Sequence, residues 1–310
     1  MSSKNLITEL RPIDLSLAKS KPTLIAASPT VSIRTALMKM HRNKITSLPV
    51  FSHQNCTDIM SIVNLFDILL YLVNDSKCHD TTIQKENLKK LDDPIELVLG
   101  LDSDRESYRI HKLDRKDKLI EALRSFASGT HRALVMNFDT NDEPWILSQT
   151  DIIQHIVRHP DSVSGLLDLN CPVRDMPLMI QKQQKLITAK ESETALHVYR
   201  FMAEKNLSGV PVVNEQGEFI GDLCVEDLPA ANLENIGQMT LSCKEYIKFT
   251  SDYLTPSVTS SNSTLKDIMN IMIKTDTHRV WILEDKKVIS VVTMSDIMAL
   301  LCSNRRPSLF

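Results

Sequence analysis

The chain repeats one pattern of hydrophobic and polar positions four times. Each copy has apolar residues at helical spacing, a short aliphatic run, a polar turn, a second aliphatic run, an aspartate and another apolar helix. Residues three and four apart share one side of a helix, so each first helix has one apolar face. The residues of these faces are Ile33, Leu37 and Met40; Leu119, Leu123 and Phe126; Ala195, Val198 and Met202; and Leu265, Ile268, Met269 and Met272.

A short aliphatic run follows each of these helices and predicts a strand. The runs cover 48–51, 133–136, 210–213 and 280–283, and polar turn residues such as Asn214 and Gly217 lead from such a run into a second strand. This order is typical of a β-hairpin. One such α/β unit cannot bury both faces of its small sheet alone. We therefore expect units to pair sheet to sheet, with the helices outside.

The aspartate that follows the second strand marks the same position in every copy: Asp67, Asp151, Asp227 and Asp296. The intervals leave linkers near 74–105, 157–184 and 229–256, and the polar C-terminal residues SNRRPSLF are expected to be mobile. The pattern places the repeats at 20–73, 105–158, 173–231 and 252–303. Consecutive repeats are expected to pair into a first module, 1–160, and a second module, 161–310.

Composition places the chain among globular proteins and narrows its partners. It has 310 residues, 42% hydrophobic and 24% charged, with a net charge of −3. At about 150 residues per domain, this length suggests about two domains. The charge balance provides no overall basic field for nucleic acid or acidic lipid, so neither is expected as a partner. The most apolar runs are interrupted by polar residues and fall short of the ~20 residues of a bilayer span, and no signal core follows the N-terminus.

Cysteine and glycine usage argue against several chemistries. The six cysteines are scattered without a CxxC pair, which favours a reduced, cytoplasmic protein, with the nucleus as a second location. Only seven glycines occur, and no phosphate loop or nucleophile elbow is present. His155 and His159 have the spacing of metal ligands on a helix, but the adjacent Arg158 disfavours a cation. No catalytic set has consistent spacing, so we expect neither a metal site nor an enzyme.

Two further motifs recur in the even-numbered copies. The tripeptide Thr-His-Arg occurs at 130–132 and again at 277–279, and the fourth copy continues to VVTMSD at 291–296. With the fourfold helix–strand–turn–strand–Asp–helix order, the chain resembles cystathionine-β-synthase (CBS) domains over about residues 20–302. It most resembles the gamma regulatory subunit of AMP-activated and sucrose-non-fermenting-type protein kinases. The resemblance implies an α/β fold of four βαββα repeats, paired into two Bateman modules that form a flat disc.

The resemblance also assigns a binding role to particular side chains. A carboxylate accepts hydrogen bonds from the two hydroxyls of a ribose, and a guanidinium presents a rigid donor fork to phosphate. The implied ribose ligands are Asp67, Asp151, Asp227 and Asp296, and the implied phosphate ligands are His131, Arg132, His278, Arg279, Ser148, Thr293 and Ser208. Two alternatives stay open: each aspartate only caps its helix, and each His-Arg pair only stabilises a helix end.

The odd-numbered copies depart from the family pattern. Three residues before the aspartate, where the family has Ser or Thr, they have Asn64 and Cys224, and Phe66 replaces a small polar residue. A thiol is a poor hydrogen-bond donor, so binding at the third copy is in doubt, as it is at the first. We align Thr46 and Ser208 with the two arginines, which would leave the odd copies without that cation.

These expectations combine into a non-catalytic sensor. By resemblance, the chain would bind AMP, ADP or ATP without a further cofactor, and would regulate a Ser/Thr kinase catalytic (alpha) subunit together with a scaffolding (beta) subunit. One alternative is a ligand-free four-repeat scaffold, similar to the divergent four-repeat regulators of fission and stress. Another is a binder of S-adenosylmethionine, which would need the ribose aspartate but not Arg132 and Arg279.

Overall fold

The computed structural model describes most of the chain. The described residues are 6–17, 21, 23–53, 58–73, 89–100, 110–140, 142–176, 186–230, 238–250 and 256–303. The C-terminal residues SNRRPSLF, apart from Ser303, and most of the first linker lie outside these ranges. No helix in the described ranges has the length and apolarity needed to cross a bilayer.

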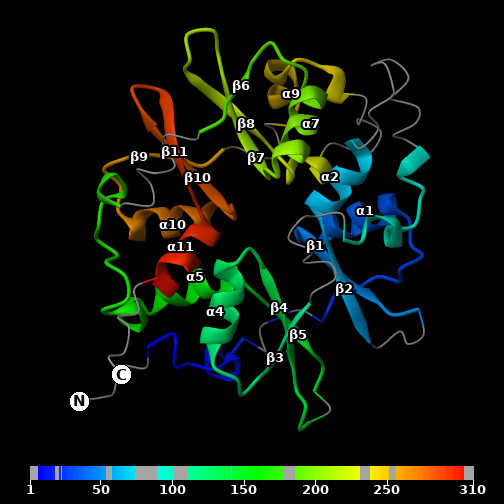
Figure 1. Cartoon of the computed structure of the whole chain (residues 1–310), viewed down its shortest axis with the longest axis vertical. Helices are drawn as coiled ribbons and strands as arrows, with labels where there is room; N and C mark the ends of the chain where they lie inside the picture. The colour runs from blue at the N-terminus through cyan, green and yellow to red at the C-terminus, as the bar shows by residue number, and fades with distance from the viewer. Residues whose placement is uncertain are drawn as a thin grey trace. The chain divides into compact units, whose positions relative to one another are not determined.

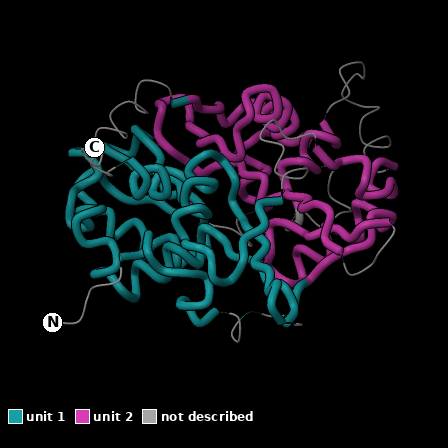
Figure 2. The backbone as a smooth tube through the Cα atoms, turned by 60° about the horizontal axis from the view of Figure 1, so that its bottom comes forward, with its two compact units in different colours: residues 1–24, 110–186, 257–310 teal, residues 25–109, 187–256 magenta. Residues whose placement is uncertain are grey.

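The contacts divide the chain into two compact units, coloured separately in Figure 2. Unit 1 combines Met1–Leu24, Ile110–Leu186 and Ser257–Phe310, and unit 2 combines Ile25–Arg109 and Ile187–Pro256. Unit 1 therefore contains the second and fourth repeats, and unit 2 the first and third. This grouping does not follow the expected division at residue 160. The pairing of consecutive repeats into modules 1–160 and 161–310, and the disc that they would form, stay predictions.

Unit 1 shows the predicted βαββα order twice (Figure 1). In both of its sheets the first strand pairs in parallel with the middle strand, which then forms an antiparallel hairpin with the last. Its elements are η1 (Pro12–Leu15), β3 (His111–Asp114), α4 (Leu119–Ala127), β4 (Arg132–Met136), β5 (Trp145–Ser148), α5 (Gln149–Arg158), η3 (Pro160–Val163), η4 (Val173–Asp175), β9 (Val258–Ser260), α10 (Leu265–Thr275), β10 (Arg279–Glu284), β11 (Lys287–Thr293) and α11 (Met294–Ser303).

Unit 2 has the same order with one shorter sheet. In the first repeat a single parallel bridge, Ala27 to Val50, replaces the first strand, so its sheet has only two strands among the described residues. The elements are α1 (Ile33–Asn43), β1 (Ser47–Phe51), β2 (Ile59–Asn64), α2 (Leu65–Val73), η2 (Ile95–Val98), β6 (Ala189–Lys190), α7 (Ala195–Lys205), β7 (Gly209–Val213), β8 (Phe219–Cys224), α8 (Asp227–Ala230) and α9 (Cys243–Thr250). The predicted fold class is confirmed.

Local sequence sets where the first helix of a repeat begins and ends. Ser32, Thr194 and Thr264 each accept a hydrogen bond from the backbone N–H three residues later, which caps the helix start. Lys44 and Asn206 end their helices in the left-handed conformation, at φ 51° and 55°. Three of the repeats therefore share the helix start, whereas Lys118 before α4 makes no side-chain cap.

The helices of two repeats pack against each other inside each unit. In unit 1, α4 packs against α11 and α5 against α10; in unit 2, α2 packs against α7 and α1 against α8. One cluster of buried residues spans both repeats in each unit. The expectation that the helices lie outside was wrong for these faces. The reason is that α2, for example, is apolar except for Asp67 and Tyr71, and it buries Leu65, Ile68, Leu69 and Leu72.

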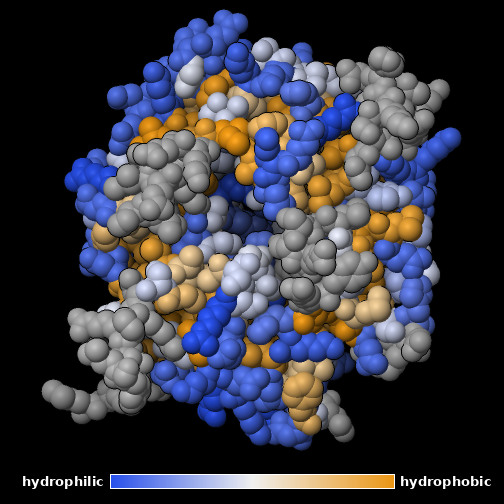
Figure 3. Space-filling model, viewed as in Figure 1, coloured by the Kyte–Doolittle hydropathy of each residue, from blue (hydrophilic) through white to orange (hydrophobic). Residues whose placement is uncertain are grey.

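Exposed apolar side chains are few and scattered among the described residues. On the face drawn in Figure 3, hydrophilic residues surround small apolar areas. Phe138, at the β4–β5 turn, is 72% exposed and is the most exposed of the described large hydrophobic residues. Scattered exposure of this kind is normal for a protein surface and marks no site by itself.

Candidate functional site

Each signature aspartate lies in the first turn of the helix that follows the hairpin. α2, α5 and α11 start directly after the last strand, and two residues lie between the end of β8 and α8, which starts at Asp227. The Oδ2 atom of each aspartate accepts a hydrogen bond from the backbone N–H of the residue three positions earlier. The N–Oδ2 distances are 3.0 Å for Asn64–Asp67, 2.8 Å for Ser148–Asp151, 2.8 Å for Cys224–Asp227 and 2.8 Å for Thr293–Asp296. All four carboxylates therefore cap the strand–helix junction, and this contact does not decide between capping alone and capping together with ribose binding.

A hydroxyl completes this junction in the even-numbered repeats. Ser148 Oγ lies 2.8 Å from Asp151 Oδ2, and Thr293 Oγ1 lies 2.7 Å from Asp296 Oδ2. In the third repeat the Cys224 thiol instead donates to the Asp222 carboxylate, at 3.1 Å. The even repeats thus place a hydroxyl and a carboxylate together, whereas the third repeat does not. The ribose and phosphate roles of these residues stay predictions.

The signature aspartate of the first repeat is more deeply buried than those of the other three. Asp67 is fully buried, whereas Asp227, Asp151 and Asp296 retain 5%, 8% and 9% of their exposure. Phe66 beside it belongs to the hydrophobic core of unit 2. The first repeat therefore offers no exposed carboxylate to a ligand in this structure, which agrees with the doubt raised by Asn64 and Phe66.

Sheet register brings the predicted phosphate residues next to the hydroxyls. Arg132 lies directly across the β4–β5 hairpin from Ser148, and Arg279 lies directly across β10–β11 from Thr293. Opposite residues of an antiparallel pair project from the same face of the sheet. The even repeats therefore gather a guanidinium, a hydroxyl and an aspartate at one end of the hairpin. Arg279 is 7% exposed.

The register also corrects an alignment made from the sequence. The carbonyls of His131 and His278 accept hydrogen bonds from the first residue of the following helix, and the carbonyls of Thr46 and Ser208 accept from the equivalent residues of the odd repeats. Thr46 and Ser208 therefore match the histidines. The arginines instead match Ser47 and Gly209, which lie across from Asn64 and Cys224. The alignment was wrong by one position, but the odd repeats still have no arginine there.

Sequence reasoning missed Lys21. Its Nζ atom lies 2.7 Å from Asp151 Oδ2, and the side chains are 23% and 9% exposed. Lys21 precedes every repeat helix and carries no motif, so no local signal connects it with an aspartate that lies 130 positions later. This contact places a second cation at the second repeat.

The signature motifs of the second and fourth repeats also touch each other within unit 1. The Gln149 amide Nε2 donates to Ser295 Oγ at 3.1 Å and lies 3.3 Å from the Phe126 carbonyl. Thr150 Oγ1 lies 3.6 Å from Met294 Sδ. These four motif residues immediately precede Asp151 and Asp296, so the two candidate sites share a packed boundary.

The residues of the even-repeat sets have the chemistry to bind a polar ligand. Within the described ranges, no group of three or more His, Cys, Asp and Glu side chains could hold a metal ion. The even-repeat sets instead combine an acceptor suited to a diol with donors suited to an anion. Such a combination fits a sugar phosphate.

Comparison with known proteins identifies relatives over nearly the whole chain. The CBS domain family matches residues 18–74, 173–231 and 251–303, which is more than half of the chain. Protein SDS23 of Kluyveromyces lactis is 22% identical over 96% of this chain and 64% of its own length. Protein SDS23 of Saccharomyces cerevisiae is 25% identical over 74% and 46%. The chain thus spans less than two thirds of the length of these curated relatives.

Solved structures reproduce the fold. Protein MJ1225 of Methanocaldococcus jannaschii, suggested to be an archaeal homologue of g-AMPK, has a TM-score of 0.71 and 20% identity, covering 93% of this chain and 99% of that one. A conserved protein of Pyrococcus horikoshii has a TM-score of 0.54 and 13% identity, covering 91% and 96%. At these identities the likeness shows a shared fold.

Proposed function

The chain belongs to the CBS domain family, and from this premise we propose that it is a non-catalytic regulatory protein that binds an adenine nucleotide, AMP, ADP or ATP. The observation that carries the proposal is the Arg–hydroxyl–Asp set at one end of each even-repeat hairpin. Arg132, Ser148 and Asp151 form one set, and Arg279, Thr293 and Asp296 form the other. The odd repeats have no arginine in this position, which restricts the proposal to unit 1.

Each member of a set has a distinct task in this proposal. The aspartate accepts hydrogen bonds from the vicinal ribose hydroxyls, and the hydroxyl and guanidinium donate to the phosphate. His131 and His278, beside the arginines, supply further donors. Nucleotides that differ in phosphate charge would be distinguished by the arginines, because the ribose contacts are common to all of them. An S-adenosylmethionine site would have no use for these arginines.

The proposed output is control of a protein partner. A nucleotide shifts a partner's state only by the difference in its affinity for the two states. We infer a Ser/Thr kinase catalytic subunit and a scaffolding subunit as partners, because the fold is shared with a protein suggested to be a homologue of g-AMPK. The proposed location is the cytoplasm, with the nucleus as a second compartment.

A ligand-free scaffold is the second candidate function. It is favoured by the full burial of Asp67, by the Cys224 thiol in place of a hydroxyl, and by the ammonium of Lys21 on Asp151. In that case the repeats would serve as a rigid surface for protein partners. Nucleotide binding separates the two functions directly.

Calorimetric titration of the full chain with AMP, ADP, ATP and S-adenosylmethionine tests the proposal. We expect at least one adenine nucleotide to bind, and Arg279→Gln to weaken it by about 10- to 150-fold, the cost of a charge-assisted hydrogen bond. Arg124→Gln is the control, since Arg124 is exposed on α4 and pairs with Glu121 of the same helix, at 3.4 Å. Equal nucleotide affinity of wild type and Arg279→Gln would exclude the phosphate assignment. Absence of binding by every nucleotide would favour the scaffold.

A further inference from the structure

The second repeat carries its own cation on the predicted ribose carboxylate. Lys21 Nζ lies 2.7 Å from Asp151 Oδ2, the same oxygen that accepts hydrogen bonds from the Ser148 N–H and hydroxyl at 2.8 Å. In an ammonium–carboxylate hydrogen bond both the donor and the acceptor are charged, whereas a hydroxyl that donates to a carboxylate brings no charge of its own. A ribose hydroxyl would have to compete with this contact as a neutral donor.

The segment before Lys21 is built into unit 1. Ile7 is fully buried, and Leu10 is 9% exposed, both within the core of that unit. Backbone hydrogen bonds join Ile7 N to the Ser162 carbonyl at 2.8 Å and Leu119 N to the Leu10 carbonyl at 2.8 Å. Residues 6–17 therefore pack along the second repeat, and the Lys21 N–H donates to the Leu17 carbonyl at 2.9 Å.

Burial makes the ion pair more than a surface contact. Exposed ion pairs are screened by water and contribute little, but the Lys21 and Asp151 side chains retain only 23% and 9% of their exposure. Breaking the pair to admit a ribose would also require the ammonium to move. The cost of binding in the second repeat thus includes the loss of this contact.

We propose that Lys21 is a specificity-determining residue: its ammonium lies on Asp151 Oδ2, offsets the charge of this carboxylate and lowers the affinity of the second repeat for the ribose of a nucleotide. The two repeats of unit 1 then differ in affinity although they share the Arg–hydroxyl–Asp set. This inference rests on the proposed nucleotide-binding function. It assigns the stronger site to the fourth repeat, at Arg279, Thr293 and Asp296, and the weaker one to the second.

Titration of the full chain with AMP tests the role of Lys21. In Lys21→Met we expect a second binding event, with an affinity about tenfold or more higher than that of the second repeat in wild type, and we expect Lys21→Met/Asp151→Asn to lose it again. Lys21→Arg keeps the cation and should behave as wild type. Lys118→Met is the matched control, because Lys118 pairs with Glu9 of the same N-terminal segment, at 2.6 Å.

The outcomes separate the inference from the function on which it rests. If wild type binds AMP and Lys21→Met gives the same isotherm, the role of Lys21 is excluded and the nucleotide function stands. If neither wild type nor any variant binds AMP, both proposals fall together. Thermal unfolding of each variant shows that it is folded, and Lys21→Gln replaces Lys21→Met in the titration if the latter is not.

Discussion

At the residue scale, one carboxylate can serve both the fold and a ligand. Asp296 caps α11 through Thr293, and Asp267 caps α10 through Thr264 with nearly the same geometry: the hydroxyl-to-Oδ2 distance is 2.7 Å in both. Asp267 lies in the first turn of α10, the first helix of its repeat, and is not part of the Arg–hydroxyl–Asp set. The two residues therefore form a natural pair for separating capping from binding.

Replacing each aspartate by asparagine tests this separation. Both Asp296→Asn and Asp267→Asn should lower the free energy of unfolding by about 0.5–2 kcal/mol, because each weakens a helix cap. Only Asp296→Asn should also weaken AMP binding, because only this carboxylate would meet the ribose. Urea unfolding and calorimetry on the same preparations provide both values. Equal AMP affinity in the two variants would show that Asp296 caps its helix and does not bind the ribose.

A histidine near the end of α5 predicts a pH dependence of stability. The pKa of His155 is lowered from 6.5 to about 4, chiefly by burial and further by the nearby His159 and Arg158. The folded ring is therefore neutral where the unfolded ring takes up a proton. The free energy of unfolding should rise as the pH rises from about 4 to 6.5, and this contribution is fully present above pH 6.5.

Urea unfolding at pH 5 and pH 7.5 measures this dependence. His155→Gln should reduce the difference between the two pH values by about 1 kcal/mol, a figure discounted because the ring is partly solvated. His41→Gln, on an exposed position of α1, should leave the difference unchanged. An unaltered pH dependence in His155→Gln would show that the ring is not desolvated in solution.

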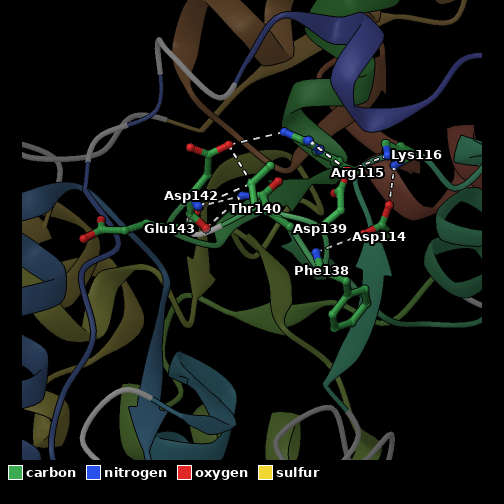
Figure 4. Close-up of polar contacts among 9 residues, drawn as sticks. Asp114, Arg115, Lys116, Phe138, Asp139, Thr140, Asp142 and Glu143 are labelled. Atoms are coloured by element: carbon green, nitrogen blue, oxygen red, sulfur yellow. Dashed lines mark hydrogen bonds and ion pairs between the residues drawn. The ribbon is translucent and has the colours of Figure 1, made fainter.

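At the element scale, the β4–β5 turn is held by a charge that comes from outside the turn. Figure 4 shows the carboxylates of Asp139 and Asp142, in the β4–β5 turn, reaching the guanidinium of Arg115, which follows β3. Both N–O distances are 3.3 Å, and the Arg115 side chain is 20% exposed. The Phe138 ring points away from these contacts (Figure 4). The parallel pairing of β3 with β4 brings the arginine to the turn.

Arg115→Gln tests how much this contact stabilises the hairpin. We expect a loss of about 1 kcal/mol in the free energy of unfolding, because a partly shielded arginine loses two carboxylate partners. Lys116→Gln should have a smaller effect, since Lys116 pairs with Asp139 from a side chain that is 56% exposed. Chemical denaturation at low and high salt compares the two variants, and a larger loss in Lys116→Gln would contradict this ranking.

At the scale of the whole molecule, each compact unit joins repeats from opposite halves of the chain. In unit 1 the join includes a buried polar contact: Gln149, 5% exposed, donates to Ser295 Oγ at 3.1 Å and to the Thr130 carbonyl at 3.4 Å. The first repeat has Leu65 at the position of Gln149, within an apolar core. At equivalent positions, therefore, unit 1 has a polar contact between its repeats and unit 2 has an apolar one.

Gln149→Leu replaces the polar side chain of unit 1 by the apolar one that the first repeat has at this position. We expect the free energy of unfolding to fall by about 1–3 kcal/mol, because the Phe126 carbonyl, which is buried, and the partly buried Ser295 hydroxyl and Thr130 carbonyl lose their donor. A double-mutant cycle with Ser295→Ala should give a coupling of at least about 0.5 kcal/mol. Strict additivity in chemical denaturation would show that the two side chains do not interact.

The sequence by itself determined the local features of this protein. Apolar spacing identified the repeated helices, aliphatic runs and turn residues identified the hairpins, and the position of Asp67, Asp151, Asp227 and Asp296 marked each strand–helix junction. These features depend on residues a few positions apart, and their periods follow from backbone geometry. The motifs of the even repeats, such as Thr-His-Arg, could be identified from the sequence for the same reason.

Only the tertiary structure decided which distant residues meet. The ion pair of Lys21 with Asp151 and the contact of Gln149 with Ser295 join residues 130 and 146 positions apart. The packing of helices between repeats, in place of the expected helices outside, is a choice of the same kind. Such contacts depend on which of several apolar or charged faces pack together, and local spacing does not encode that choice.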